Sequence, residues 1–252
     1  MLLVEVRPPI RSSTKKIEIP RMRNSVSLGA GIQGFAKKLL NKPNTVVKIA
    51  LVSAVDAYEE FIKVAIAHQS NPFFPRIYGI KKYKIDTLDP TEYAQLMADL
   101  GVQPEHIPGD YMLKHLHWIL IIAMEKLVPI DNPRVSETMI QVIHQLFGEE
   151  YLNKLMHGDH NEYEEEDFQS INFLLTGLTY FADDIIKSTP HPQFRNALRL
   201  LKPLWAKWMP DTKSDNIMVR LTSTGPQLVF IDPVWSHPTG PINNNSYVLS
   251  YK

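Results

Sequence analysis

Apolar residues follow two different periods along the chain, and the change falls near residue 128. Before it, short runs rich in β-branched and aromatic residues predict strands at 45–49, 76–84 and 112–124. After it, apolar residues recur every three or four positions, which predicts helices with one buried face. The pattern favours an α+β protein in which strands dominate the first part and helices the second.

Three apolar stripes at helical spacing predict core-facing helices in the second part. They are formed by Met139, Ile140, Ile143, Leu146 and Phe147; by Ile171, Leu174, Leu175, Leu178, Ala182, Ile185 and Ile186; and by Phe194, Ala197, Leu198, Leu201, Leu204, Trp205 and Trp208. In the first part, Ser53 or Asp56 can cap a helix that runs to about His68. The segment 91–100 predicts a short helix, and the turn at 222–226 predicts a hairpin between two apolar runs.

Size and composition restrict the classes of protein that remain. The 252 residues suit one domain of two lobes or two small domains, and the formal net charge of +0 argues against a dedicated nucleic-acid binder. No apolar run approaches the roughly 20 residues of a membrane span, so no membrane partner is expected. The sequence has no cysteine, which excludes disulfides and thiolate metal sites and fits a reducing compartment.

The candidate chemistry gathers in the polar loop 211–216, which reads Asp-Thr-Lys-Ser-Asp-Asn. Apolar runs follow at 217–219 and 229–231, and the second run delivers Asp232 to its end. Phosphoryl transfer from ATP needs such a set: a carboxylate to orient the attacking hydroxyl, an Asn and an Asp to hold Mg²⁺, and a cation for the phosphate. The alternative interpretation is an ordinary polar hairpin turn.

An earlier Gly-x-Gly-x-x-Gly pattern is formed by Gly29, Gly31 and Gly34. Dinucleotide folds and kinases both use this pattern, but a dinucleotide fingerprint opens a helix. Here the glycines lead to a strand that contains Lys48, which is the order of a glycine flap followed by a phosphate-binding lysine. The alternative for Lys48 is a lysine that reaches solvent at a sheet edge.

The helix after that strand carries two adjacent carboxylates. On a helical wheel Glu59 borders the apolar face, whereas Glu60 points away from it. A kinase holds its strand lysine with a glutamate on a helix, so Glu59 is chosen over Glu60 as the partner of Lys48. The alternative is that both are surface carboxylates.

Histidines offer only weak candidates for a metal site. His115 and His117 share one strand face, but no third ligand accompanies them. The segment 157–161, His-Gly-Asp-His-Asn, is similar to a phosphotransferase motif, but Glu164 stands where that motif has Asn. This segment is better interpreted as a solvated loop between helices.

Taken in order, these motifs resemble the protein-kinase-like superfamily. The loop 211–216 is similar to the catalytic loop, and Ile-Asp-Pro at 231–233 occupies the place of the Asp-Phe-Gly metal motif. The likeness spans about 26–236, and the segments 213–218 and 231–234 look closest to the early serine/threonine protein kinases of short-tailed bacteriophages.

The resemblance implies a two-lobed fold, with a small β-rich N-lobe at 1–127 and a helical C-lobe at 128–252 that is truncated after the metal-binding Asp motif. It implies an ATP- and Mg²⁺-dependent serine/threonine kinase that phosphorylates host proteins in the bacterial cytoplasm and so redirects host transcription or defence. Direct binding to nucleic acid is not expected.

The resemblance also assigns roles to single residues. Asp211 orients the substrate hydroxyl and Lys213 steadies the γ-phosphate, whereas Asn216 and Asp232 bind Mg²⁺. In the hinge, Met124 guards the back of the adenine pocket, Glu125 and Leu127 offer backbone groups to adenine, and Asp131 reaches the ribose. The remaining ATP-binding residues that the resemblance implies are Gly29, Gly31, Gly34, Lys48 and Glu59.

The likeness also has departures, and they leave other functions open. Met209-Pro210 replaces His-Arg, so the arginine that reads a phosphorylated activation loop is missing. Residues 234–252 are too few for an activation segment and the last helices of a full lobe. A small-molecule kinase of the same fold, such as an aminoglycoside or metabolite kinase, is one alternative. A pseudokinase-like binding protein that blocks a host factor is another.

Overall fold

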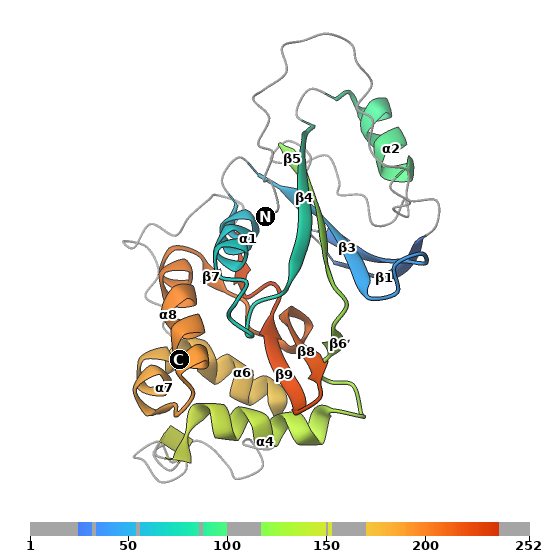
Figure 1. The fold of residues 1–252 in the computed structure, drawn as a ribbon. Helices are drawn as coiled ribbons and strands as arrows, with labels where there is room; N and C mark the ends of the chain where they lie inside the picture. The colour runs from blue at the N-terminus through green and yellow to red at the C-terminus, as the bar shows by residue number, and fades with distance from the viewer. Residues whose placement is uncertain are drawn as a thin grey trace. The chain divides into compact units, whose positions relative to one another are not determined.

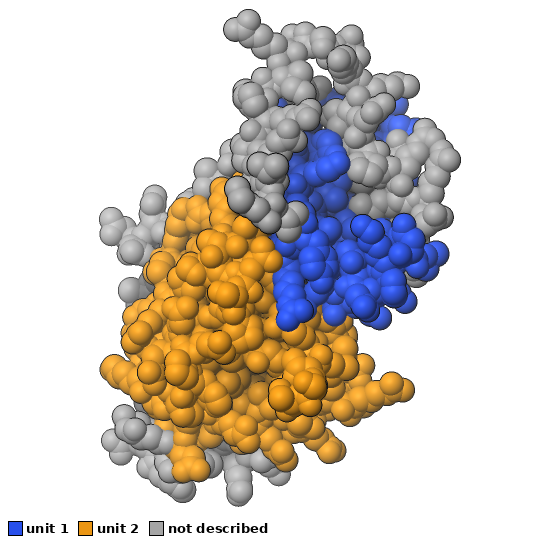
Figure 2. Space-filling model, in the orientation of Figure 1, with its two compact units in different colours: residues 1–56, 76–126 blue, residues 57–75, 127–252 orange. Residues whose placement is uncertain are grey.

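The computed structural model describes residues 25–31, 34–53, 56–85, 88–99, 117–149, 151–152 and 170–236. They form a mixed α+β protein, as the pattern of apolar residues predicts (Figure 1). The chain divides into two compact units, residues 1–56 with 76–126 and residues 57–75 with 127–252 (Figure 2). Within the described ranges, no helix is both long and apolar enough to cross a membrane.

The first unit is built on a five-stranded antiparallel sheet with the strand order β1-β2-β3-β5-β4. The strands are β1 Ser25–Gly31, β2 Gly34–Leu39, β3 Thr45–Val52, β4 Ile77–Lys84 and β5 Trp118–Glu125. Strands β3 and β5 lie inside the sheet, and most of their side chains are buried. Burial on both faces explains why these two strands read as continuous apolar runs.

One face of this sheet is covered by helix α2, which spans Pro90–Asp99. Its buried side chains pack with those of Phe35, Val47, Ile49, Leu51, Ile119 and Ile121. Strand β4 forms an edge of the sheet, where the exposed side chains of Lys81, Lys82 and Lys84 oppose pairing with another strand.

The second unit contains helices α1 Ala57–Ala67, α4 Ser136–Phe147, α6 Ile171–Tyr180, α7 Ala182–Ser188 and α8 Pro192–Lys207. Helix α8 contacts α1, α7 and the short strand that follows it. Its buried stripe consists of Phe194, Ala197, Leu198, Leu201, Leu204 and Trp205. The predicted third stripe is therefore confirmed as the core face of one long helix.

The segment after α1 is tied to the second unit by hydrogen bonds and ring contacts. The Arg220 guanidinium donates to the carbonyls of Pro72 and Phe74, with N–O distances of 2.6 and 2.9 Å. The ring centroids of Phe73 and Phe194 lie 4.9 Å apart. These contacts explain why α1 and the segment that follows group with the helices of the second unit.

Two small sheets in the second unit frame the candidate loop. Strands β6 Val128–Pro129, β8 Ile217–Thr222 and β9 Gly225–Phe230 form an antiparallel sheet in the order β6-β8-β9. Strand β7 Met209–Pro210 pairs with β10 Val234–Trp235. Gly225 closes the β8–β9 hairpin with a φ of 125°, a backbone conformation that glycine adopts without strain.

Some sequence expectations differ from the structure. The second apolar stripe forms two helices, α6 and α7, which are separated at Phe181. The sequence predicts the lobe boundary at 127/128, and the structure divides the chain between Lys126 and Leu127. The structure also assigns residues 57–75, which the sequence places in the N-lobe, to the second unit. Residues 112–116 of the predicted long strand lie outside the described residues; the described part is β5.

Candidate active site

The loop 211–216 lies between the end of α8 and the start of β8. On one side it is held by β7, in which Pro210 pairs with Val234 of β10. On the other side it closes into a 3-10 turn, Ser214–Asn216, that runs directly into β8. Because β10 follows Asp232 closely in the chain, this pairing brings the loop and the Asp232 segment together.

Asn216 joins the two segments through its backbone and its side chain. Its carbonyl accepts hydrogen bonds from the N–H groups of Ile231, at 3.0 Å, and Asp232, at 3.2 Å. Its Nδ2 donates to the Asp211 carbonyl at 3.0 Å, and the side chain is buried. No hydrogen bond described for the chain uses Oδ1 of Asn216, an oxygen that can act as an acceptor.

The Pro233 carbonyl makes a second connection between the two segments. It accepts hydrogen bonds from the Asp211 N–H and from Nε1 of Trp205, both at 3.0 Å. The buried Thr212 hydroxyl donates to the Leu175 carbonyl at 3.0 Å, which fastens the loop to α6. The backbone positions of Asp211, Asn216 and Asp232 are therefore fixed by bonds that do not use the two carboxylates.

The side chains of Asp211 and Lys213 share the outer part of the loop. Lys213 Nζ lies 3.6 Å from Asp211 Oδ1. The Lys213 side chain is 58% exposed and the Asp211 side chain is 27% exposed. Asp211 is therefore a carboxylate that an incoming hydroxyl can reach, with an exposed cation beside it. Such a pair can orient a nucleophile and balance the charge of a transferred anion.

Asn216 and Asp232 carry the kinds of side-chain oxygen that Mg²⁺ prefers. This ion prefers carboxylate and carbonyl oxygens, and it commonly takes only one or two protein ligands beside waters and substrate phosphates. Across the described residues, no three His, Cys, Asp or Glu side chains gather in one place, so a site that uses protein ligands alone is not indicated. His115 and the segment 157–161 lie outside the described residues.

Helix α1 places one of its two carboxylates, Glu60, differently from the sequence expectation. Glu59 forms an ion pair with Lys63, with an N–O distance of 3.2 Å. Glu60, which was expected to point away from the packed face, accepts hydrogen bonds from Nε1 of Trp208, at 2.8 Å, and from Nζ of Lys207. Glu60 therefore links α1 to the last residues before the candidate loop, and sequence reasoning missed this role.

The environment of Glu60 lowers the pKa of its carboxyl. Burial alone raises the pKa of its carboxyl, but the hydrogen bonds from Lys207 and Trp208 lower it, and the net pKa lies below the usual value. The one sequence signal for this contact is Trp208 at the end of a buried stripe, because a buried indole N–H needs an acceptor.

In the first unit, the three glycines and Lys48 occupy adjacent strands. Gly29 and Gly31 lie in β1 and Gly34 begins β2, so the glycine pattern spans a hairpin whose last pair is Gly31 and Gly34. Lys48 lies in β3, paired with Ala36 on one side. Glu59 belongs to the second unit, so its pairing with Lys48 stays a prediction.

The hinge candidates lie at the end of β5 and beyond. Met124 is buried in β5, and Asp131 is exposed in a turn. The Glu125 N–H donates to the Arg76 carbonyl at 2.9 Å, so this N–H is already used within the first unit. Leu127 is buried and its predicted backbone contact with adenine stays a prediction.

No protein-family model matches the chain, and no curated protein matches it either. Function must therefore be inferred from the residues and their geometry.

Proposed function

We propose that the protein is an ATP- and Mg²⁺-dependent phosphotransferase with a protein-kinase-like two-lobed fold, and that it acts as a serine/threonine kinase on bacterial host proteins. One observation carries the proposal. The loop that contains Asp211 and Asn216 is bonded to the Asp232 segment through the carbonyls of Asn216 and Pro233. The backbone of the loop that carries Asp211 and Asn216 is thus bonded to the backbone of the Asp232 segment within the second unit.

The chemistry of each group supports its proposed role. Asp211 is partly exposed and can accept a hydrogen bond from the substrate hydroxyl, which orients that oxygen for attack on the γ-phosphate. Lys213 beside it can move with the transferred phosphate, because its side chain is the more exposed of the two. Asn216 and Asp232 would hold Mg²⁺, which when bound neutralises the phosphate charge.

The first unit supplies features that suit the ATP phosphates. A hairpin that contains Gly29, Gly31 and Gly34 allows close approach of backbone N–H groups to a ligand. Lys48 on the neighbouring strand β3 is a cation in an otherwise apolar strand. Both features support a nucleotide-binding role for the sheet, with Lys48 at the α- and β-phosphates.

A small-molecule kinase of the same fold is the second candidate. It is favoured by α6, which lies in sequence between α4 and α8 and holds the candidate loop through the hydrogen bond from Thr212 to the Leu175 carbonyl. Helices next to a phosphoryl-transfer loop can enclose a small acceptor as well as support a protein acceptor.

The proposal is tested by offering both kinds of acceptor. Purified protein is incubated with γ-labelled ATP and Mg²⁺, once with bacterial lysate and once with pools of aminoglycosides and metabolites. Label in protein bands supports the protein kinase, whereas label in small molecules alone supports the second candidate. ATP binding without any transfer would replace both with a binding protein of kinase-like fold.

A further inference from the structure

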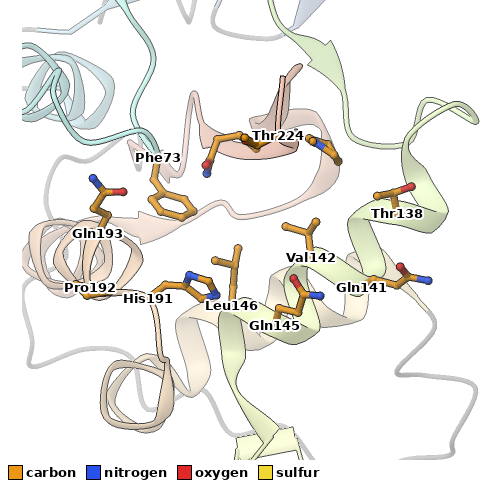
Figure 3. Close-up of a pocket in the computed structure, with 13 residues that line it drawn as sticks. Phe73, Thr138, Gln141, Val142, Gln145, Leu146, His191, Pro192, Gln193 and Thr224 are labelled. Carbon is orange, nitrogen blue, oxygen red and sulfur yellow. The ribbon is translucent and has the colours of Figure 1, made fainter. Parts of the chain in front are cut away.

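A groove in the second unit lies between α4, the start of α8 and the β8–β9 hairpin (Figure 3). Its volume is about 440 Å³, which is within the range of peptide and small-ligand sites. Val142 and Leu146 project from α4 toward Phe73 and Thr224 in this view. None of these residues belongs to the candidate loop, so the groove is separate from the phosphoryl-transfer residues.

The lining of the groove has no carboxylate, lysine or arginine. Of the described residues that line it, none is Asp, Glu, Lys or Arg, and His191 is the one titratable side chain. A nucleotide would find no lysine or arginine for its phosphates, and a basic peptide would find no carboxylate. The groove therefore suits a neutral ligand.

Side-chain amides surround the groove and come from three elements. Gln141 and Gln145 lie one turn apart on α4, Gln193 is at the start of α8, and Gln227 is on β9. A glutamine amide presents donors and an acceptor together, and each peptide unit of a polypeptide presents one donor and one acceptor. Gln141, Gln145 and Gln193 are exposed, so their amides can meet a ligand.

The floor of the groove is apolar. Phe73 and Leu146 are buried, and Val142 is half-buried. An apolar floor inside a polar rim is the usual arrangement of a protein-binding patch. Strand β9 is an edge strand at this place, but Pro226 has no N–H to offer, so side chains rather than strand addition must supply most hydrogen bonds.

We propose that this groove binds a short, uncharged polypeptide segment of the protein substrate, with an apolar residue on Phe73 and Leu146 and with its backbone bonded by the glutamine amides. The role of the docked segment rests on the proposed function, because docking would bring a protein acceptor to the second unit. Binding itself needs neither ATP nor catalysis.

The test is an array of random-sequence decapeptides probed with labelled protein in the absence of ATP. Wild type is compared with Gln141→Glu, Gln145→Glu and the double variant. Each substitution replaces an exposed amide with a carboxylate of nearly the same shape. Asn196→Asp is the matched control, because it changes an exposed amide to a carboxylate on α8 outside the groove. Asp232→Ala is included to separate docking from phosphoryl transfer.

We expect wild type, Asn196→Asp and Asp232→Ala to select peptides that are poor in Asp, Glu, Lys and Arg. The double variant should bind the best of these peptides about tenfold more weakly, which corresponds to the loss of one good contact. It should also bind peptides rich in Lys and Arg that wild type does not select. Unchanged selection by the double variant, or a wild type that binds no peptide or prefers charged ones, would overturn the docking site. If selection is as expected but no label is transferred from ATP, the docking site stands and the kinase proposal fails.

Discussion

The Glu60 carboxylate accepts a hydrogen bond from the Trp208 indole, with an Oε2–Nε1 distance of 2.8 Å. Trp208 is fully buried and directly precedes β7, so the bond ties helix α1 to the chain that enters the candidate loop. A second bond, from the Ala57 N–H to Ser236 Oγ at 2.7 Å, ties the start of α1 to the chain just after β10. Helix α1 is therefore fastened at two points to the segments that carry Asp211 and Asp232.

Replacing Glu60 with Gln should lower stability in a pH-dependent way. The folded pKa of Glu60 is below its ordinary value of 4.5, so the charged form stabilises the fold above about pH 4.5 and this contribution is lost as the pH falls through the lower folded pKa. With allowance for partial exposure, we expect Glu60→Gln to cost about 1 kcal/mol at neutral pH and progressively less below pH 4.5, as measured by urea unfolding.

A control separates this effect from general charge loss. Asp183 pairs with Lys202 on the surface, and Asp183→Asn should change the free energy of unfolding less than Glu60→Gln at neutral pH. A Glu60→Gln penalty that stays constant from neutral to acid pH would show that the carboxylate charge does not act on stability.

Asp211→Asn should strongly reduce phosphoryl transfer while leaving the fold intact. The loop is held through the backbone N–H and carbonyl of Asp211, and the amide retains both, so the unfolding midpoint should change little. Losing the base should reduce kcat by about 10²–10⁴-fold. The measurement is turnover of γ-labelled ATP beside Lys213→Met, which should lower kcat less; equal activity of Asp211→Asn and wild type would contradict the role of the carboxylate.

Much of this loop could be predicted from sequence because the signals are local. The two-residue turn at 223–224 and the apolar runs beside it specify the β8–β9 hairpin, and the hairpin returns Asp232 to Asn216. The β-branched run of β3 likewise specifies a buried strand. In both cases neighbouring residues contain the information.

The features that could not be predicted from the sequence depend on contacts between distant parts of the chain. Glu60 is one of two adjacent carboxylates, and only its meeting with Trp208, a distant residue on the chain, distinguishes it from Glu59. The break at Phe181 was invisible because Ala182 and Ile185 are buried after it, so the apolar stripe continues across two helices. The grouping of α1 with the second unit follows from its contacts with α8 and β10 and from the bond of Arg220 to the segment after α1.

Trp205→Phe tests whether the Pro233 carbonyl helps to hold the metal motif. The substitution removes the Nε1 bond to that carbonyl while keeping an aromatic ring in a buried site. We expect a loss of about 1 kcal/mol in the free energy of unfolding and a lower kcat with a smaller change in the KM for ATP. Trp235→Phe, at a half-buried position, is the control; a kcat for Trp205→Phe equal to that of this control would count against the coupling.

Tyr93→Phe should stabilise the first unit. The buried Tyr93 hydroxyl has no hydrogen-bond partner among the described residues, and burial raises its pKa to about 12. Removing a buried unpaired hydroxyl recovers part of its desolvation penalty, on the order of 1 kcal/mol. Thermal unfolding should show a higher midpoint, whereas a lower midpoint would indicate that the hydroxyl has a partner in the folded protein.

The most direct test of the account compares wild type with Asp232→Ala in the transfer of label from γ-labelled ATP in the presence of Mg²⁺. The account predicts transfer by wild type that is lost in the variant, while circular dichroism shows the same fold because the Asp232 N–H still bonds to the Asn216 carbonyl. Equal transfer by both proteins, or a wild type that does not bind ATP at all, would contradict the claim that Asp211, Asn216 and Asp232 form a phosphoryl-transfer site.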